Sequence, residues 1–425
     1  HRSAGDDGDF PCQCSHRLVS PYFDWPLLRL AVTISHARTT ECCRVSMLRL
    51  LSDQERVIYD RVCTYIDEHA TPALRREAEL GEYIFGGVES RRFIRGFAAN
   101  GWLVPHWPAA YGGLGATAAL SYSSREAMSR AGIPHSFCAA HMAGDVLIKY
   151  GSPYLREQFL ARIARGEIEF AVGYSEPGAG SDMLALRMKA EDCGDHYLVN
   201  GQKVFNTHAH QAEYHWLAVR TDSEAPNHKA LSILLVDLDS PGVTIRPMIT
   251  IAGSRTNEVF YVDVRVPKAR LVGEPNKGFT YILGQLARER LFPPGQHLRH
   301  FDSIVHTVRA LPDPAGFRQR LAQSKIELEA SRLLYERCAT LMDQGKDPDL
   351  ESSLQKLFMS DCAQKMSRLG LDVSGGAGFG PPREGEEVNS VTKQLANVVL
   401  TIYGGASEIQ KNIIAQRGMG LPRSR

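Results

Sequence analysis

The chain of 425 residues lacks the features that would place it in a membrane, on nucleic acid or in a disulfide-rich fold. No apolar run approaches the roughly 18–20 residues that span a bilayer. A formal net charge of +1 gives no bulk attraction to nucleic acid or to an anionic surface. The nine cysteines are scattered and odd in number, which argues against a disulfide framework. We therefore expect a cytoplasmic protein without membrane insertion and without a nucleic-acid partner.

Metal-site patterns are also missing. Cys12 and Cys14 have no second pair at zinc-site spacing. A cluster of histidines with one glutamate, His208, His210, Glu213 and His215, contains no H-E-x-x-H pattern. The sequence therefore predicts no metal site.

Length and periodicity predict three packed regions after an N-terminal extension. The first 46 residues begin with His1 and lack the apolar core of a signal peptide, so we expect a disordered or non-native extension. Residues 47–167 show a helical period, which begins with the capping-box pair Ser52 and Glu55. Residues 168–270 contain short β-rich runs, and residues 271–425 return to the helical period. The fold class expected is α+β.

The β-rich runs follow one another without intervening helices, which favours an antiparallel, barrel-like sheet over a Rossmann unit. Turn signals at 193–195, 200–201 and 240–242 separate these runs, and the Asn-Gly pair at 200–201 predicts a hairpin. In the last region, apolar spacing predicts helices over 321–341, over 354–369 with an end at Gly370, and over 407–417.

The most informative motif is the run YSEPGAGSD at residues 174–182, which follows a predicted strand. Glycines let the backbone approach a ligand closely, and successive N–H groups can bind phosphate. Pro177 excludes a G-x-S-x-G nucleophile elbow. By itself the run is equally typical of a plain turn.

Four signatures, in order, resemble the acyl-CoA dehydrogenase family over about residues 47–423. They are the run at 107–113, the run at 174–182 with NGQKVFNT at 200–207, EVFYVDVRVP at 258–267 with LVGE at 271–274, and YGGASEIQKNIIAQRGMGLPR at 403–423. The resemblance implies an α-helical domain, a β domain and a C-terminal four-helix bundle. It also implies FAD between the last two.

The resemblance assigns binding residues to this chain. Those expected to contact FAD are Val172, Tyr174, Ser175, Gly180, Ser181, Phe205, Thr207, Ala406 and Glu408, together with Asp372, Gly375 and Gly376 from a neighbouring subunit. Those expected to contact the substrate are Ser181, Arg290, Tyr403 and Gly404. The run SGGAGFG at 374–380 is similar to G-x-G-x-x-G, but it follows a helix and not a strand, so it does not indicate a Rossmann site.

The family's usual catalytic base is absent. Most members carry a glutamate directly after the tyrosine of the C-terminal motif, where this chain has Gly404 after Tyr403. The isovaleryl-type minority carry the base on an earlier helix directly before an arginine, and Glu289 precedes Arg290. On residue chemistry alone Glu289 is typical of a surface glutamate, whereas the resemblance makes it the base that removes the α proton. The resemblance further implies oxidation of an acyl-CoA to the trans-2-enoyl-CoA, with electrons passed to an electron-transfer flavoprotein.

Two other functions stay open. Family members that act as flavin monooxygenases or oxidases often lack the dehydrogenase glutamate, and other chains serve as non-catalytic partner subunits. The family's Arg-x-Phe-Gly element is not visible at residues 308–314, where only Arg309 could substitute for its arginine. We expect a tetramer or dimer, homomeric or heteromeric. The sequence does not identify the acyl group of the substrate, and the resemblance favours the lipid- and steroid-degrading bacterial branch of the family.

Overall fold

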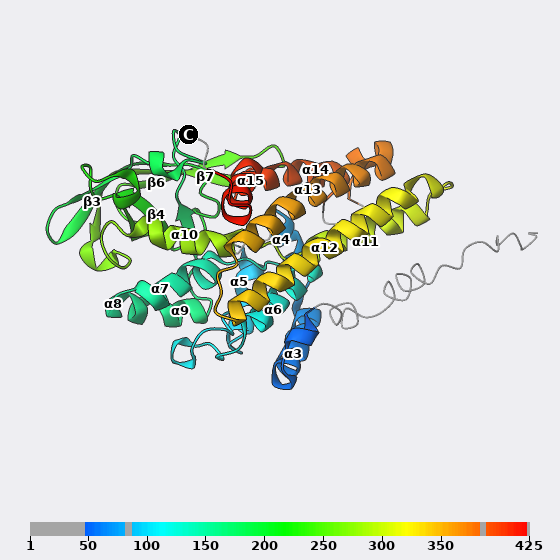
Figure 1. Cartoon of the computed structure of the whole chain (residues 1–425), viewed down its shortest axis with the longest axis horizontal. Coiled ribbons are helices and arrows are strands. Elements are labelled where there is room, and N and C mark those ends of the chain that lie inside the picture. Colours follow the sequence, from blue (N-terminus) through cyan, green and yellow to red (C-terminus); the bar gives the residue numbers. More distant parts are fainter. Residues whose placement is uncertain (1–46, 81–86, 383–387, 423–425) are drawn as a thin grey trace, which may run out of the picture.

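The computed structural model describes residues 47–80, 87–382 and 388–422, and the predicted extension at 1–46 lies outside the described residues. An N-terminal helical region is followed by a β domain and then by long C-terminal helices (Figure 1). This arrangement confirms the predicted α+β class. Among the described helices, none is long and apolar enough to cross a membrane.

The N-terminal region holds helices α3 to α9. Their bounds are α3 Asp53–His69, α4 Pro72–Leu80, α5 Val88–Ala98, α6 Ala118–Ala131, α7 Gly144–Tyr150, α8 Pro153–Leu155 and α9 Ala161–Ala164, with π-helical turns η3 Ala139–Ala143 and η4 Arg156–Leu160. The predicted capping box is present, because the Ser52 hydroxyl accepts from the Glu55 N–H and the Glu55 carboxylate accepts from the Ser52 N–H. The other carboxylate oxygen of Glu55 accepts from the N–H and hydroxyl of Thr117, the N-cap of α6. One residue thus joins the starts of two helices.

The β domain is one seven-stranded sheet. The strands are β1 Phe170–Gly173, β2 Lys189–Asp192, β3 His196–Lys203, β4 Tyr214–Arg220, β5 Leu231–Asp237, β6 Val243–Ile249 and β7 Arg255–Pro267. They run in the order β1-β4-β2-β3-β7-β6, and β5 pairs with β4. The main ladders are antiparallel, as expected, but β1 and β2 each pair with β4 in parallel.

One turn prediction in this domain is wrong. Asn200 and Gly201 lie inside β3, where the register against β7 shifts between Val199 and Gly201. Gly201 has a φ of +145°, which suits a β-bulge and strains residues with a Cβ. The Asn-Gly pair therefore bends a continuous strand and does not end it.

The C-terminal region contains six helices in the described residues. They are α10 Gly278–Glu289, α11 Gly295–Arg309, α12 Arg318–Asp343, α13 Asp349–Ser374, α14 Ser390–Val398 and α15 Ser407–Ile413, the last extended by the π-helical turn η11 Ile414–Gly418. Helix α13 passes through the predicted stop at Gly370 and ends at Ser374, because Gly375, with a φ of +51°, follows it there. Gly370 is buried inside the helix, near His300 and Ile304 of α11.

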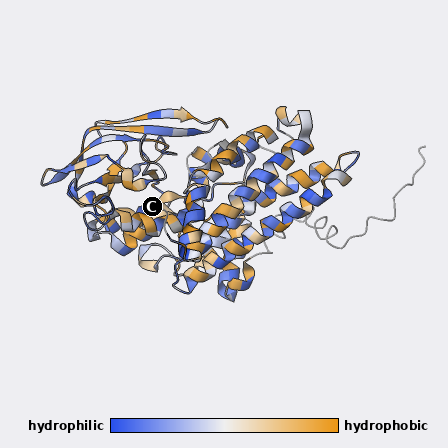
Figure 2. Cartoon of the chain, turned by 45° about the horizontal axis from the view of Figure 1, so that its top comes forward, coloured by the Kyte–Doolittle hydropathy of each residue, from blue (hydrophilic) through white to orange (hydrophobic). Residues whose placement is uncertain are grey.

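The hydrophobic cores differ between these regions. The N-terminal helices and the β domain share one cluster of buried side chains, which reaches Tyr281 and Ile282 of α10. The bundle of α11 to α13 has a smaller cluster of its own. Its helices carry hydrophilic and hydrophobic residues side by side (Figure 2), and Ile326 of α12 is 63% exposed. Helix α10 thus belongs to the larger core and also leads into the bundle.

Candidate active site

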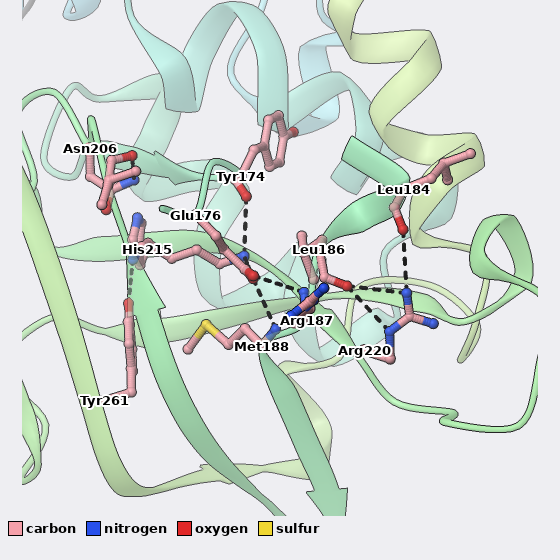
Figure 3. A network of polar contacts seen from close by, with 12 residues as sticks. Tyr174, Glu176, Leu184, Leu186, Arg187, Met188, Asn206, His215, Arg220 and Tyr261 are labelled. Atoms are coloured by element: carbon pink, nitrogen blue, oxygen red, sulfur yellow. Dashed lines mark hydrogen bonds and ion pairs between the residues drawn. The ribbon is translucent and has the colours of Figure 1, made fainter. Parts of the chain in front are cut away.

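The loop after β1 is held in place by a buried ion pair. The Glu176 carboxylate accepts from the main-chain N–H groups of Arg187 and Met188 and from the Lys203 Nζ, at 2.8, 2.9 and 2.9 Å (Figure 3). The Lys203 side chain is fully buried, and burial lowers its pKa to about 8. Its Nζ also donates to the Tyr174 carbonyl at 3.1 Å. The shape of residues 174–188 therefore depends on these contacts.

The segment after β3 lies against the end of β1. The Asn206 side-chain amide donates to the Val172 carbonyl at 2.9 Å, and the Val204 N–H donates to the Ser175 carbonyl at 3.0 Å. Asn206 Oδ1 is buried without a hydrogen-bond partner in the described residues. Phe205 has a φ of +58° and is 64% exposed. A strained backbone that exposes a large ring is unusual for a core aromatic and suits a ligand-contacting residue.

Glu289 lies at the last position of α10, on the helical face that carries the buried Tyr281, Ile282 and Gln285. Its side chain is half-buried, but its Oε2 atom is buried and has no hydrogen-bond partner in the described residues. Burial raises the pKa of Glu289, while the charges of Arg290 and Lys356 oppose that rise. The predicted base is therefore not an ordinary surface glutamate.

The arginines on both sides of Glu289 are tied to carboxylates. Arg288 forms an ion pair with Asp145 of α7, and Asp145 also accepts from the Trp107 indole at 2.9 Å. Arg290 is buried and donates to Asp349 of α13 at 2.8 Å. The last turn of α10 is thus anchored to both the N-terminal region and the bundle. The Asp349 pairing gives Arg290 a structural partner besides its predicted substrate contact.

The segment 400–405 is held by donors from two other helices. Lys356 of α13 is fully buried, and its Nζ donates to the carbonyls of Leu400 and Gly405, both at 2.8 Å. The side-chain amide of Gln410 donates to the carbonyls of Gly404 and Gly405 at 3.1 and 3.0 Å. Burial lowers the pKa of Lys356 to about 8, and Glu289 acts to raise it. Lys356 therefore binds this turn, and its charge also acts on Glu289.

Gly404 combines a φ of +62° with open space around it. A Cβ at Gly404 would lie 3.9 Å from both Lys356 Cε and Phe292 Cζ, so the position has room for a side chain. Its N–H makes no hydrogen bond within the described residues. The Tyr403 ring packs edge-on against Phe292, with centroids 5.6 Å apart. The predicted Ala406 and Glu408 follow at the start of α15.

The structure brings some predicted site residues together and leaves others apart. Tyr174 connects the β-domain loop to α10, because its hydroxyl donates to Gln285 at 2.6 Å. Burial raises the pKa of Tyr174, and the charge of Glu289 raises it further. Gly180 and Ser181 lie in an exposed turn.

Asp372, Gly375 and Gly376 are exposed at the far end of α13. Asp372 lies 16 positions after Lys356, which corresponds to about 24 Å of helix. Asp372 pairs there with Arg320. Any contact of this turn with a cofactor would therefore involve the site of another subunit.

Two polar residues of the site were not predicted. Lys356 and Gln285 are both buried in helices. The glutamine lies within the apolar run of α10, which is the signal that could have identified it. Lys356 has the polar neighbours Ser353, Gln355 and Ser360 along α13, so no local pattern marks it. Within the described residues there is no group of three or more histidine, cysteine, aspartate or glutamate side chains that could hold a metal ion.

Comparisons with known proteins agree with this architecture. Three family models match in order: the acyl-CoA dehydrogenase N-terminal domain at residues 52–167, the middle domain at 171–264 and the C-terminal domain at 276–419. The fold and these three matches define the class as an acyl-CoA oxidoreductase. The chain belongs to the acyl-CoA dehydrogenase family and is an enzyme that acts on a CH–CH bond.

Named relatives cover nearly the whole chain. Acyl-CoA dehydrogenase FadE29 of Mycobacterium tuberculosis is 34% identical over 391 residues, which are 88% of this chain and 98% of that protein. The solved structure titled "Tcur3481-Tcur3483 steroid ACAD" has a TM-score of 0.80 and 31% identity, and the match covers 88% of this chain and 99% of that one. A chain of the ChsE4-ChsE5 complex from Mycobacterium tuberculosis has a TM-score of 0.77 and 31% identity, with coverage of 90% and 100%.

Proposed function

We propose that this enzyme dehydrogenates an acyl-CoA thioester between its α and β carbons, with FAD as cofactor and Glu289 as the base. Two observations carry the proposal: the Glu289 Oε2 atom is buried without a hydrogen-bond partner in the described residues, and Lys356, whose charge acts on Glu289, binds the turn that contains Gly404. A dry pocket raises the pKa of a carboxylate towards neutrality, where a general base works well.

The residues around β1 and β3 fit FAD. Phe205 exposes its ring, and among the described residues the buried Asn206 Oδ1 has no hydrogen-bond partner and a Cβ at Gly178 or Gly180 would meet nothing within 4 Å. A planar ring system with a phosphate-bearing tail needs an aromatic contact, a polar atom and accessible backbone N–H groups of this kind. Val172, Tyr174, Ser175, Gly180, Ser181, Phe205 and Thr207 would hold FAD within one chain. Bound FAD would supply the acceptor for the hydride that leaves the β carbon.

The protein's own part in the reaction is proton transfer and charge stabilisation. The Glu289 carboxylate would remove the α proton, and the Gly404 N–H would donate to the thioester oxygen as negative charge develops there. A main-chain donor does not need a side chain, so the glycine at position 404 is compatible with this role. The cations Arg290 and Lys356 would keep Glu289 able to ionise despite its burial.

The relatives support a proposal for the partners and the substrate class. The proposed product is the trans-2-enoyl-CoA, and the electrons would pass to an electron-transfer flavoprotein. One similar structure is titled a "steroid ACAD", and another is a complex of two differently named chains. We propose an acyl-CoA with a bulky, steroid-type acyl group and an oligomer, either homomeric or heteromeric, in which Asp372, Gly375 and Gly376 reach a neighbour's cofactor.

The function is tested by anaerobic titration of the purified protein with a panel of acyl-CoAs, including straight-chain, branched, cyclohexane and steroid side-chain thioesters. The flavin absorbance should bleach with at least one of them, and the enoyl-CoA should form. Turnover that requires oxygen would indicate the oxidase alternative. A protein that stays colourless with added FAD would indicate the partner-subunit alternative.

A further inference from the structure

Gln285 is a buried polar residue one helical turn before Glu289. It is 1% exposed, and it lies on the face of α10 that packs against the β domain. Residues four apart on a helix have Cβ atoms about 5–6 Å apart on one face, within reach of a side-chain hydrogen bond. Gln285 can therefore interact with Glu289 without any movement of the backbone.

A chain of hydrogen bonds fixes which way the Gln285 amide faces. The Trp216 indole can only donate, and it donates to the Tyr174 hydroxyl at 3.1 Å. The Tyr174 hydroxyl donates in turn to Gln285 Oε1 at 2.6 Å. The amide oxygen is thereby held towards Tyr174, and the amide nitrogen is turned away from it. That nitrogen, Nε2, is buried and has no partner in the described residues.

Glu289 presents the complementary group. Its Oε2 atom is buried and also lacks a partner in the described residues. The charged and titratable groups that act on Glu289 are Arg290 of its own helix end, Lys356 of α13, Tyr174 after β1 and Cys138 before η3. A buried donor and a buried acceptor that are both unpaired are unfavourable, and one hydrogen bond would relieve both.

We propose that Gln285 is a positioning residue that holds the Glu289 carboxylate through an Nε2–H to Oε2 hydrogen bond, and that Trp216 and Tyr174 fix its orientation. The bond is not formed in this structure, and rotation of the Glu289 side chain would close it. The inference rests on the proposed function, since it gives Glu289 the task of base. A hydrogen bond to the ionised form favours that form, so Gln285 would act in the same direction as Arg290 and Lys356.

The test compares the pH dependence of flavin reduction in the wild-type enzyme and in Gln285→Met, which keeps the length of the side chain and removes the donor. The acidic limb of the profile should move to higher pH by about one unit, as expected when a charged group loses a hydrogen bond. Infrared difference spectra of protein with ¹³C-labelled glutamate can follow the carboxyl band of Glu289, which is the band that Glu289→Gln removes. In Gln285→Met, the pH at which this band titrates should rise by the same amount. This second readout does not depend on turnover.

Two variants separate positioning from stability. Tyr174→Phe removes the hydroxyl that orients the amide, so the limb should move in the same direction by a smaller amount. In Gln355→Met another buried glutamine is lost, one whose amide donates to the Phe292 carbonyl at 2.9 Å and to the Ser331 hydroxyl at 3.3 Å. That variant should lower the melting temperature and leave the acidic limb in place.

The outcomes distinguish this inference from the function itself. If Glu289→Gln abolishes flavin reduction while Gln285→Met leaves the limb and the infrared band unchanged, the inference fails and the function stands. A higher KM without a pKa shift would show that Gln285 contacts the acyl group, which also overturns the inference. If flavin reduction in Glu289→Gln occurs at the wild-type rate, the assignment of Glu289 as the base is wrong, and the inference about Gln285 fails with it.

Discussion

The last turn of α10 and the turn at residues 400–405 are built in opposite ways. The α10 turn provides a buried carboxylate, and its flanking arginines are tied to Asp145 and Asp349. In the 400–405 turn, Lys356 and Gln410 bind carbonyl oxygens, while the Gly404 N–H makes no hydrogen bond within the described residues. Under the proposed function, this contrast means that the base, Glu289, is on a helix while the main-chain donor, the Gly404 N–H, stays in the turn.

The largest stability effect should come from Lys356, which binds the 400–405 turn and whose charge acts on Glu289. Lys356→Met removes two charge-assisted hydrogen bonds to carbonyls, which contribute roughly 1.5–3 kcal/mol each, so the free energy of unfolding should fall by about 3 kcal/mol. Denaturant unfolding measures the change.

Ser360→Ala is the matched control for this variant. The Ser360 hydroxyl donates to the same Leu400 carbonyl at 2.9 Å, and its loss should lower the free energy of unfolding by about 1 kcal/mol. Equal losses from both variants would show that Lys356 does not hold the turn.

The next effect separates two adjacent glycines. A Cβ at Gly405 would lie 2.4 Å from Gln410 Nε2, whereas the nearest atoms at Gly404 are 3.9 Å away. Both positions have positive φ, which disfavours alanine by about 1–2 kcal/mol. Gly405→Ala should therefore lower the melting temperature more than Gly404→Ala does. The reverse order would contradict the open position at residue 404.

These regions also show what the sequence can and cannot predict. The Ser52 capping box and the alternation of helical and strand periods depend on local patterns, and they were predicted correctly. The structure of the Asn-Gly pair at residues 200–201 was predicted wrongly. The same two residue types suit both a β-bulge and a hairpin turn, and only the pairing of β3 with β7 decides between them. A polar residue in the apolar run of α10 marks Gln285, but it does not reveal the role of that residue, because Gln285 and Lys356 act through partners distant in sequence, such as Tyr174 and Leu400.

The smallest effect concerns the Glu289 charge and its pH dependence. Burial raises the pKa of Glu289 in the folded state, so the folded protein holds this proton more readily than the unfolded chain does. The stability from this group is complete below the unfolded pKa and is lost as pH rises through the folded pKa. Glu289→Gln should therefore melt at a higher temperature than the wild type at pH 8, with the gap closing towards pH 4. A lower melting temperature of Glu289→Gln than of the wild type at pH 8 would contradict a Glu289 carboxylate whose charge is disfavoured by burial.

The central claim is that Glu289 removes the α proton, and rapid-reaction flavin reduction tests it most directly. An acyl-CoA that bleaches the wild-type flavin is mixed anaerobically with Glu289→Gln, in which FAD binding should be intact. The rate of flavin reduction should fall by at least about 10²-fold, as expected for the loss of a positioned general base. Reduction at the wild-type rate would contradict the account.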